Sequence, residues 1–355
     1  MSPTTTPRYN RHKTYQWNYD HAPDPVEVNT ADLPGDWRFC GQRVASPLGV
    51  PAGPLLNGRW LLYYAGLGFD VLTYKTVRSG PRPCYEPPNL QPVDCESIYG
   101  GSLYGGEVDL VAVDKDTTSW AVAFGMPSQS PDVWREDIER TRQALAGEKV
   151  LSVSVVGTIQ QGWTIDQLAD DYARCARWAA ESGADCIETN FSCPNVATRD
   201  GQLYQEVASA ALVAERVRAA IDKTPLIIKV GHMPDESNAD ALISAVSPYA
   251  DALAMTNSVA TTVVDASGHR LFDGQKRGIC GGAIREASVQ QTELFARRIA
   301  QLGVSLEVIG VGGICSAEHV REYLRAGASS VQLATAAMLD PEIGLRIRRE
   351  LAGHS

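Results

Sequence analysis

From residue 47 onward, short runs of apolar residues alternate with longer stretches in which apolar residues recur every three or four positions. The short runs predict buried strands, and the longer stretches predict amphipathic helices. A chain that alternates in this way typically builds repeated βα units around a parallel sheet. The predicted strands cover residues 48–52, 71–74, 150–156, 185–190, 226–230, 252–256, 307–311 and 330–334. The predicted helices include residues 132–146, 165–182, 203–220, 287–301 and 317–326.

Eight predicted strands favour a closed barrel, and a chain of 355 residues is long enough for one such barrel with insertions. We expect an α/β fold, namely a (β/α)8 TIM barrel over residues 41–355 preceded by an N-terminal arm over residues 1–40. The competing topology is a doubly wound sheet, which usually has fewer strands and a glycine-rich turn after the first. Residues 79–120 and 259–284 show neither the apolar runs of the predicted strands nor the apolar spacing of the predicted helices. We expect them to be long irregular insertions at the catalytic face of the barrel, because each follows a predicted strand.

The first 40 residues are polar but carry Tyr9, Tyr15, Trp17, Tyr19 and Trp37. This segment lacks the apolar core of a signal peptide, and no stretch of the chain approaches the roughly 20 apolar residues of a membrane span. We expect an arm that packs on the outside of the barrel or on a second subunit, so a homodimer stays open. No membrane partner is expected.

The net charge of -10 comes without a compact block of Lys and Arg, which argues against a nucleic-acid or anionic-membrane surface. Eight cysteines are scattered without a C-x-x-C pair, and the six histidines are equally dispersed. This spacing supports neither a zinc site nor an iron–sulfur cluster. We therefore expect reduced thiols, no metal, a cytoplasmic location and small molecules as the binding partners.

Residues 188–196 read E-T-N-F-S-C-P-N-V and begin within a predicted strand. Cys193 lies between Asn190 and Asn195, whose carboxamides can donate to and accept from the alternating N–H and C=O edge of a pyrimidine-like ring. The thiol could act as a proton-transfer base, because its unperturbed pKa of about 8.5 can be tuned by a positive neighbour. Pro194 biases Cys193 away from helical dihedrals. The alternative is a strand end with capping asparagines and a structural thiol.

Turns built from small residues end the last two predicted strands. The first contains Gly312 and Gly313, and the second contains Ala334 and Thr335. In barrels, this pair of loops commonly forms a phosphate cradle from backbone N–H groups. The turns therefore indicate a phosphate-bearing cofactor or substrate, and simple tight turns are the alternative.

Lys75 and Lys229 each end an otherwise apolar predicted strand, where a cation needs a partner. The lysines could form salt bridges at the barrel rim. They could also supply positive charge to a flavin ring and so stabilise its anionic reduced form. Asn257 and Ser258 add an uncharged hydrogen-bonding pair after the sixth predicted strand.

The order of these motifs along residues 47–351 resembles that of dihydroorotate dehydrogenases of class 1, the soluble class that uses a cysteine base. Besides the features above, the resemblance includes Pro51-Ala52-Gly53, Lys75-Thr76, Thr256-Asn257-Ser258 and Gly278-Ile279-Cys280-Gly281. It implies FMN as the cofactor and a place in pyrimidine metabolism. It also implies oxidation of a dihydropyrimidine at a CH–CH bond, with a proton passing to Cys193 and a hydride to flavin N5.

The resemblance also implies roles for individual residues. Cys193 and Lys75 would be catalytic. The substrate side would comprise Lys75, Asn190, Asn195, Asn257, Ser258, Gly125 and Met126. The cofactor side would comprise Ala52, Gly53, Lys75, Thr76, Ser154, Asn190, Lys229, Thr256, Gly281, Gly312, Gly313, Ala334 and Thr335.

The sequence departs from the family pattern on the substrate side. Family members carry an Asn shortly before a Met-Gly-Leu-Pro-Asn segment, where it helps to hold the substrate carboxylate. Here residues 121–128 read A-V-A-F-G-M-P-S, which places Val122 at that position, and residues 95–120 look like an insertion. We expect a weaker hold on dihydroorotate.

Two alternatives therefore stay open. One is the same chemistry on another cyclic amide or enone. The other is a flavin-free isomerase or lyase that binds a phosphorylated metabolite. The sequence has no nicotinamide fingerprint, and it leaves the electron acceptor undefined.

Overall fold

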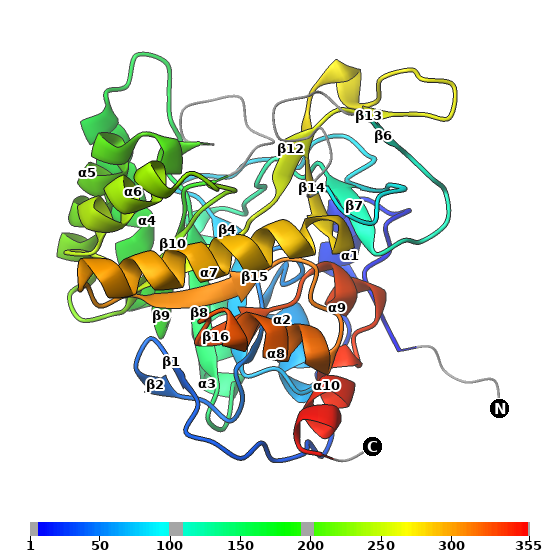
Figure 1. Cartoon of the computed structure of the whole chain (residues 1–355), viewed down its shortest axis with the longest axis horizontal. Coiled ribbons are helices and arrows are strands. Elements are labelled where there is room, and N and C mark those ends of the chain that lie inside the picture. The colour runs from blue at the N-terminus through cyan, green and yellow to red at the C-terminus, as the bar shows by residue number, and fades with distance from the viewer. Residues whose placement is uncertain (1–5, 99–108, 193–201, 354–355) are drawn as a thin grey trace.

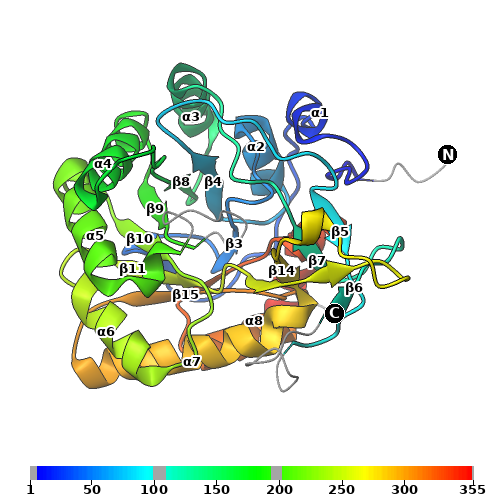
Figure 2. The ribbon, with the colours of Figure 1, turned by 90° about the horizontal axis from the view of Figure 1, so that it is seen from above.

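In the computed structural model, which describes residues 6–98, 109–192 and 202–353, eight parallel strands close into a barrel in the order β10-β11-β15-β16-β3-β4-β8-β9. Helices surround the barrel, as Figure 2 shows from above. The strands are β3 (Leu48–Val50), β4 (Val71–Val77), β8 (Val150–Val155), β9 (Cys186–Asn190), β10 (Leu226–Lys229), β11 (Ala252–Met255), β15 (Glu307–Val311) and β16 (Ser330–Gln332). The predicted TIM barrel is confirmed, and each predicted strand overlaps one of these.

The helices around the barrel follow the predicted order. They are α2 (Gly58–Gly66), α3 (Pro131–Ala144), α4 (Ile165–Glu181), α5 (Val207–Ile221), α6 (Glu236–Val246), α7 (Arg285–Leu302), α8 (Ala317–Arg325), α9 (Thr335–Leu339) and α10 (Ile343–Leu351). The helix predicted from residue 203 begins only at residue 207, after a 3₁₀ turn, η2 (Leu203–Gln205). A capping box between Thr164 and Gln167 starts α4, and Gly303, with φ 67°, ends α7. None of the helices in the described ranges is long and apolar enough to cross a membrane.

The amino-terminal end of the barrel is closed by a short hairpin, β1 (Arg38–Phe39) and β2 (Gln42–Arg43). Phe39 and Val44 pack against inward-facing apolar residues of the barrel strands. The hairpin lies at the bottom of Figure 1, opposite the end where the strands point. The predicted boundary between the N-terminal arm and the barrel, at residue 40, therefore falls within the turn of this hairpin.

The N-terminal arm packs on the barrel of its own chain. Its helix α1 (Tyr15–Asp20) lies beside the barrel, and the rings of Tyr9 and Tyr15 meet the ring of Phe124 at 6.1 and 6.0 Å between centroids. Both tyrosines belong to the main hydrophobic core. Phe124 directly precedes Gly125 and Met126, so the arm supports the segment expected to face the substrate.

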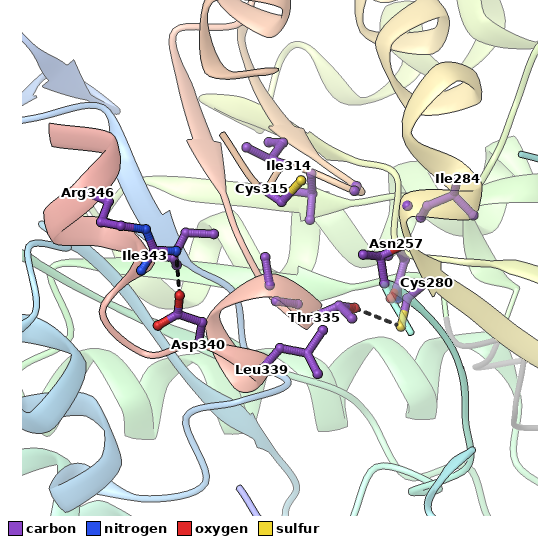
Figure 3. A pocket seen from close by; sticks show the side chains of 18 residues that line it. Asn257, Cys280, Ile284, Ile314, Cys315, Thr335, Leu339, Asp340, Ile343 and Arg346 are labelled. Atoms are coloured by element: carbon purple, nitrogen blue, oxygen red, sulfur yellow. Dashed lines mark hydrogen bonds and ion pairs between the residues drawn. The ribbon is translucent and has the colours of Figure 1, made fainter. Parts of the chain in front are cut away.

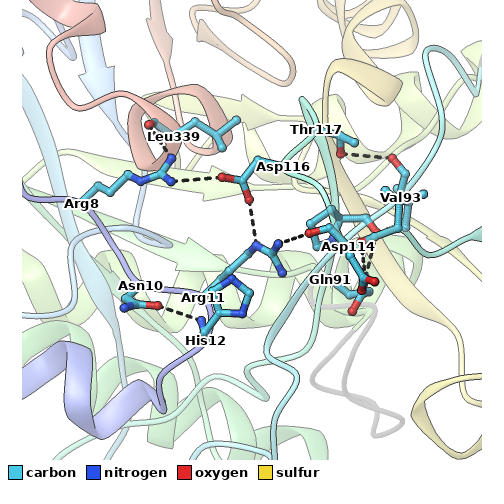
Figure 4. A network of polar contacts seen from close by, with 12 residues as sticks. Arg8, Asn10, Arg11, His12, Gln91, Val93, Asp114, Asp116, Thr117 and Leu339 are labelled. Atoms are coloured by element: carbon cyan, nitrogen blue, oxygen red, sulfur yellow. Dashed lines mark hydrogen bonds and ion pairs between the residues drawn. The ribbon is translucent and has the colours of Figure 1, made fainter. Parts of the chain in front are cut away.

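Two arginines fasten the start of the arm to other parts of the chain (Figure 4). Arg8 and Arg11 bind the two carboxylate oxygens of Asp116 at 3.1 and 2.8 Å. Arg8 also donates to the carbonyl oxygen of Leu339 in α9 at 3.1 Å, and Arg11 donates to that of Asp114. The arm thus joins the first insertion to the last part of the barrel.

The two insertions are not irregular, and that expectation was wrong. They contain β5 (Leu90–Pro92), β6 (Leu110–Val111), β7 (Ser119–Val122), β12 (Val259–Thr261), β13 (Val263–Val264) and β14 (Arg277–Gly281). Strands β12, β14, β7 and β5 form one small sheet, and β13 pairs with β6. Strands this short carry too few residues to show a period, and each pairs with a distant segment of the chain. The small sheet lies at the end of the barrel opposite the hairpin (Figure 1).

Candidate functional site

A cavity of about 250 Å³ lies where the last two barrel strands end, between the small sheet and helices α9 and α10. Figure 3 shows Asn257, Cys280 and Thr335 at one end of the cavity and Arg346 with Asp340 at the other. Six of the predicted site residues line it, namely Asn257, Gly281, Gly312, Gly313, Ala334 and Thr335. The structure therefore brings together the residues predicted to form a phosphate cradle.

Three of these residues must be glycine. The φ angles of Gly281, Gly312 and Gly313 are 85°, 139° and 65°, which side chains rarely adopt. A Cβ atom on Gly281 would lie 2.0 Å from the carbonyl oxygen of Thr118. On Gly312 it would lie 2.4 Å from Ser288 Oγ, and on Gly313 it would lie 2.7 Å from the Gly281 carbonyl oxygen. The backbone of β14 and that of the turn after β15 therefore approach as closely as glycine allows.

Two of the carboxamides predicted to face the substrate, those of Asn190 and Asn257, form a connected cluster at the mouth of the barrel. Asn257 Nδ2 donates to Asn190 Oδ1 at 3.3 Å and to the carbonyl oxygen of Ser192. Asn190 Nδ2 in turn contacts Met126 Sδ at 3.6 Å. Ser258 is buried next to Asn257. Three segments that are distant in sequence therefore meet here, and Asn257 also lines the cavity.

Gly125 and Met126 form a tight turn, with φ angles of 73° and 52°. A Cβ atom on Gly125 would lie 2.6 Å from the ring of Tyr85, so glycine is required. This turn follows β7, where Val122 pairs with Gly278 of β14. The predicted substrate segment thus lies between the small sheet and the barrel mouth.

Both predicted lysines are buried at the strand ends, with 7% exposure for Lys75 and 6% for Lys229. Lys229 Nζ lies 4.0 Å from Glu188 Oε1 on the neighbouring strand. The pairing of β4 with β8 shifts register between Tyr74 and Val77. Such an irregularity re-aims side chains, and Thr76 Oγ1 lies 3.0 Å from Ser154 Oγ.

Three further predicted cofactor residues, Ala52, Gly53 and Thr256, are not among the residues that line the cavity. Ala52 is buried just beyond β3, and Gly53 is exposed, with open space where a Cβ atom would point. Thr256 is fully buried, and its Oγ1 has no hydrogen-bond partner among the described residues. All three lie at the carboxyl ends of barrel strands. Their assignment to the cofactor stays a prediction.

Cys193 and Asn195, the predicted base and its neighbouring carboxamide, lie outside the described residues. Two other thiols lie near the site. Burial raises the pKa of Cys280 to about 11, against the effect of its contact with Thr335 Oγ1 at 3.3 Å. Burial also raises the pKa of Cys84 to about 11, although the Lys75 ammonium opposes this. Both thiols are therefore protonated at neutral pH and unsuited to act as a base.

Arg78 is a site residue that the sequence analysis missed. It is fully buried, and its guanidinium donates to the carbonyl oxygens of Met126 and Gly157 at 3.1 and 3.0 Å and to Thr158 Oγ1 at 3.0 Å. It thereby fixes the backbone of the turn that contacts Asn190. The available signal was a second cation at the end of the apolar strand that already carries Lys75.

The part of the chain that the structure describes contains no group of three or more His, Cys, Asp and Glu residues that could hold a metal ion. The arrangement instead offers buried cations, carboxamides and a glycine cradle. These groups suit an organic ligand that carries a phosphate and a second, planar ligand with N–H and C=O groups.

Known proteins resemble the chain in sequence and in fold. Residues 111–354 match the family described as dihydroorotate dehydrogenase. The dihydroorotate dehydrogenase of Dictyostelium discoideum is 32% identical over 367 residues, which cover 97% of each chain. The catalytic subunit of dihydroorotate dehydrogenase B (NAD(+)) from Desulforudis audaxviator is 28% identical and covers 88% of this chain and 90% of its own.

A solved structure shares the architecture. The crystal structure of DHODH from Eimeria tenella in complex with ferulenol superposes with a TM-score of 0.73 and covers 99% of this chain and 92% of its own. At 17% sequence identity this likeness concerns the fold. With the barrel, the cavity and the sequence matches together, the chain belongs to the dihydroorotate dehydrogenase family.

Proposed function

We propose that this chain oxidises dihydroorotate at its CH–CH bond, with FMN as the hydride acceptor and Cys193 as the proton-transfer base. The enzymes of the family are FMN-dependent flavoproteins, which displaces the flavin-free isomerase or lyase alternative. The observation that carries the proposal is that the glycine cavity and the carboxamide cluster are connected. Asn257 lines the glycine cavity and also donates to Asn190 in the carboxamide cluster.

The residues present fit FMN. Three glycines without room for a Cβ atom leave their backbone close to the cavity, as a phosphate requires. Gly281, Gly312, Gly313 and Thr335 would hold the phosphate end, while Lys229 and Asn190 would lie at the ring end. When bound, FMN supplies a two-electron acceptor for the substrate hydride.

The chain's own groups bind the substrate and move its proton. The carboxamides of Asn190 and Asn257 bind the N–H and C=O edge of the pyrimidine ring, and the Lys75 ammonium attracts the substrate's negative charge. Cys193 takes the proton from one ring carbon. Because Cys84 and Cys280 are held protonated, neither competes for this role.

The test is the identity of the chromophore in the purified protein. We expect a yellow protein that releases FMN on denaturation, because nothing in the proposed site requires a covalent link. Anaerobic addition of dihydroorotate should then bleach the flavin band. A colourless protein that takes up no added FMN would contradict the proposal.

Replacing Gly281 with alanine should weaken FMN binding about tenfold, because the strain of a blocked positive-φ position is roughly 1–3 kcal/mol. The new Cβ atom would collide with the Thr118 carbonyl oxygen at 2.0 Å. Fluorescence titration of FMN into the apoprotein measures the affinity. Gly268→Ala is the matched control, since Gly268 has a φ of 87° but open space around it. Equal affinities of the two variants would argue against the cradle.

Replacing Val122 with asparagine should lower the KM for dihydroorotate about tenfold. Val122 offers the substrate carboxylate no side-chain donor, and one hydrogen bond to a charged group is worth about 1.5–3 kcal/mol. An uncharged dihydropyrimidine should show no such gain. Val111→Asn is the control, because Val111 is an exposed valine in the first insertion. If the KM does not change, another group already holds the carboxylate, and the alternative of an uncharged cyclic substrate loses its support.

A further inference from the structure

The barrel interior contains a polar layer just below its mouth. The register of the strands places Thr73, Glu188, Ala254 and Gln332, which come from alternate strands, at one level. Gln332 Nε2 donates to Thr73 Oγ1 at 3.1 Å, which shows that these side chains meet inside the barrel. Branched apolar residues usually fill this position in such barrels. Here three of the four members are polar.

Several polar atoms of this region lack hydrogen-bond partners among the described residues. Glu188 is 1% exposed, and neither of its carboxylate oxygens accepts a hydrogen bond there. The same holds for Gln332 Oε1 in the same layer and for Ser152 Oγ one level below. Leaving buried polar atoms unsatisfied costs free energy, and a buried carboxylate costs most. The layer therefore needs something that donates hydrogen bonds.

Water is the ligand that fits these atoms. A buried water typically makes about three hydrogen bonds to otherwise unsatisfied groups. Glu188, Gln332 and Ser152 supply acceptors, and the Ser152 hydroxyl can also donate. Ala254 contributes only a methyl group to the layer. A metal cation is disfavoured, because the Lys229 ammonium already lies 4.0 Å from the carboxylate.

We propose that this layer is hydrated, that water bridges Glu188 to Ser152 or Gln332, and that the Glu188 carboxylate holds the Lys229 ammonium in place. Glu188 is then a positioning residue that acts through Lys229. Its negative charge partly offsets the positive charge that Lys229 presents to the flavin. This second part rests on the proposed function, whereas the water site does not.

The first test is a high-resolution crystal structure of the holoenzyme. We expect an ordered water within hydrogen-bond distance of the Glu188 carboxylate and of Ser152 or Gln332. Ser152→Val should remove this water without changing either charge. The absence of an ordered water from this layer in the wild-type protein would overturn the proposal, even if the protein binds no flavin.

The second test is the midpoint potential of the bound flavin, measured by titration with a redox dye. Glu188→Gln keeps the shape of the side chain but removes the charge that offsets Lys229. We expect the reduction equilibrium to shift at least tenfold toward the reduced flavin, which is about 30 mV for a two-electron couple.

Glu307→Gln is the matched control. Glu307 lies at the opposite end of the barrel, where its carboxylate accepts from the backbone N–H groups of Cys40 and Gly41 at 2.9 and 3.2 Å. This variant should leave the potential unchanged. An unchanged potential in Glu188→Gln, or a shift toward the oxidised flavin, would overturn the positioning role. Absence of any bound flavin would instead count against the proposed function.

Discussion

Replacing Cys193 with alanine is expected to slow the reduction of the bound flavin by dihydroorotate by on the order of 100-fold or more, the usual scale for losing a general base. The other thiols near the site cannot take over, because burial holds Cys84 and Cys280 in their protonated forms. FMN should stay bound, since none of the cavity-lining residues is changed. Stopped-flow absorbance under anaerobic conditions measures the rate.

Cys95→Ala is the control for this experiment. Cys95 is a partly buried thiol that packs against the core of the small sheet. It should reduce its flavin at the wild-type rate. A Cys193→Ala protein that does the same would make Cys193 a structural thiol and would leave the base unidentified.

Replacing Arg78 with methionine is expected to raise the KM for dihydroorotate by ten- to a hundredfold while FMN remains bound. The guanidinium donates to the carbonyl oxygen of Met126, and Met126 contacts Asn190 at the mouth of the barrel. One lost hydrogen bond from a charged group corresponds to about 1.5–3 kcal/mol, or roughly ten- to a hundredfold in affinity. Steady-state kinetics with FMN content measured in parallel would show the effect.

A general loss of stability must be separated from this positioning role. Arg82→Met removes a second guanidinium from the same loop, but only backbone hydrogen bonds join Arg82 to Ser128. It should leave the KM unchanged. An Arg78→Met protein that loses FMN and melts early, with an unaltered KM, would show that Arg78 only supports the fold.

The barrel could be predicted from the sequence because its strands are buried on both faces. All four residues of β10, for example, are buried, so the strand stands out as an apolar run. The strands of the two insertions could not be predicted in this way. Strands β6 and β13 have two residues each, and they form only because the two insertions meet in space.

The candidate site also contains some residues that could be predicted from the sequence and others that could not. Glycines and asparagines next to strand ends can be recognised in the sequence as candidate site residues, and most of them lie together. The role of Arg78 could not be recognised from the sequence, because its partner is the backbone carbonyl of Met126. The position of that carbonyl depends on the fold rather than on residue type. The contact between Asn257 and Asn190 likewise requires β9 and β11 to be close in the closed barrel.

Closure of the barrel joins residues made early in synthesis to residues made late. Strand β16 pairs with β3 through Val331 with Leu48 and Gln332 with Gly49. The glycine turn after β15 and helix α9 also come from the last part of the chain. A chain that is still being made therefore has the strands proposed to face the pyrimidine before it has the last residues proposed to hold FMN. We therefore expect FMN to bind only after β16 has paired with β3.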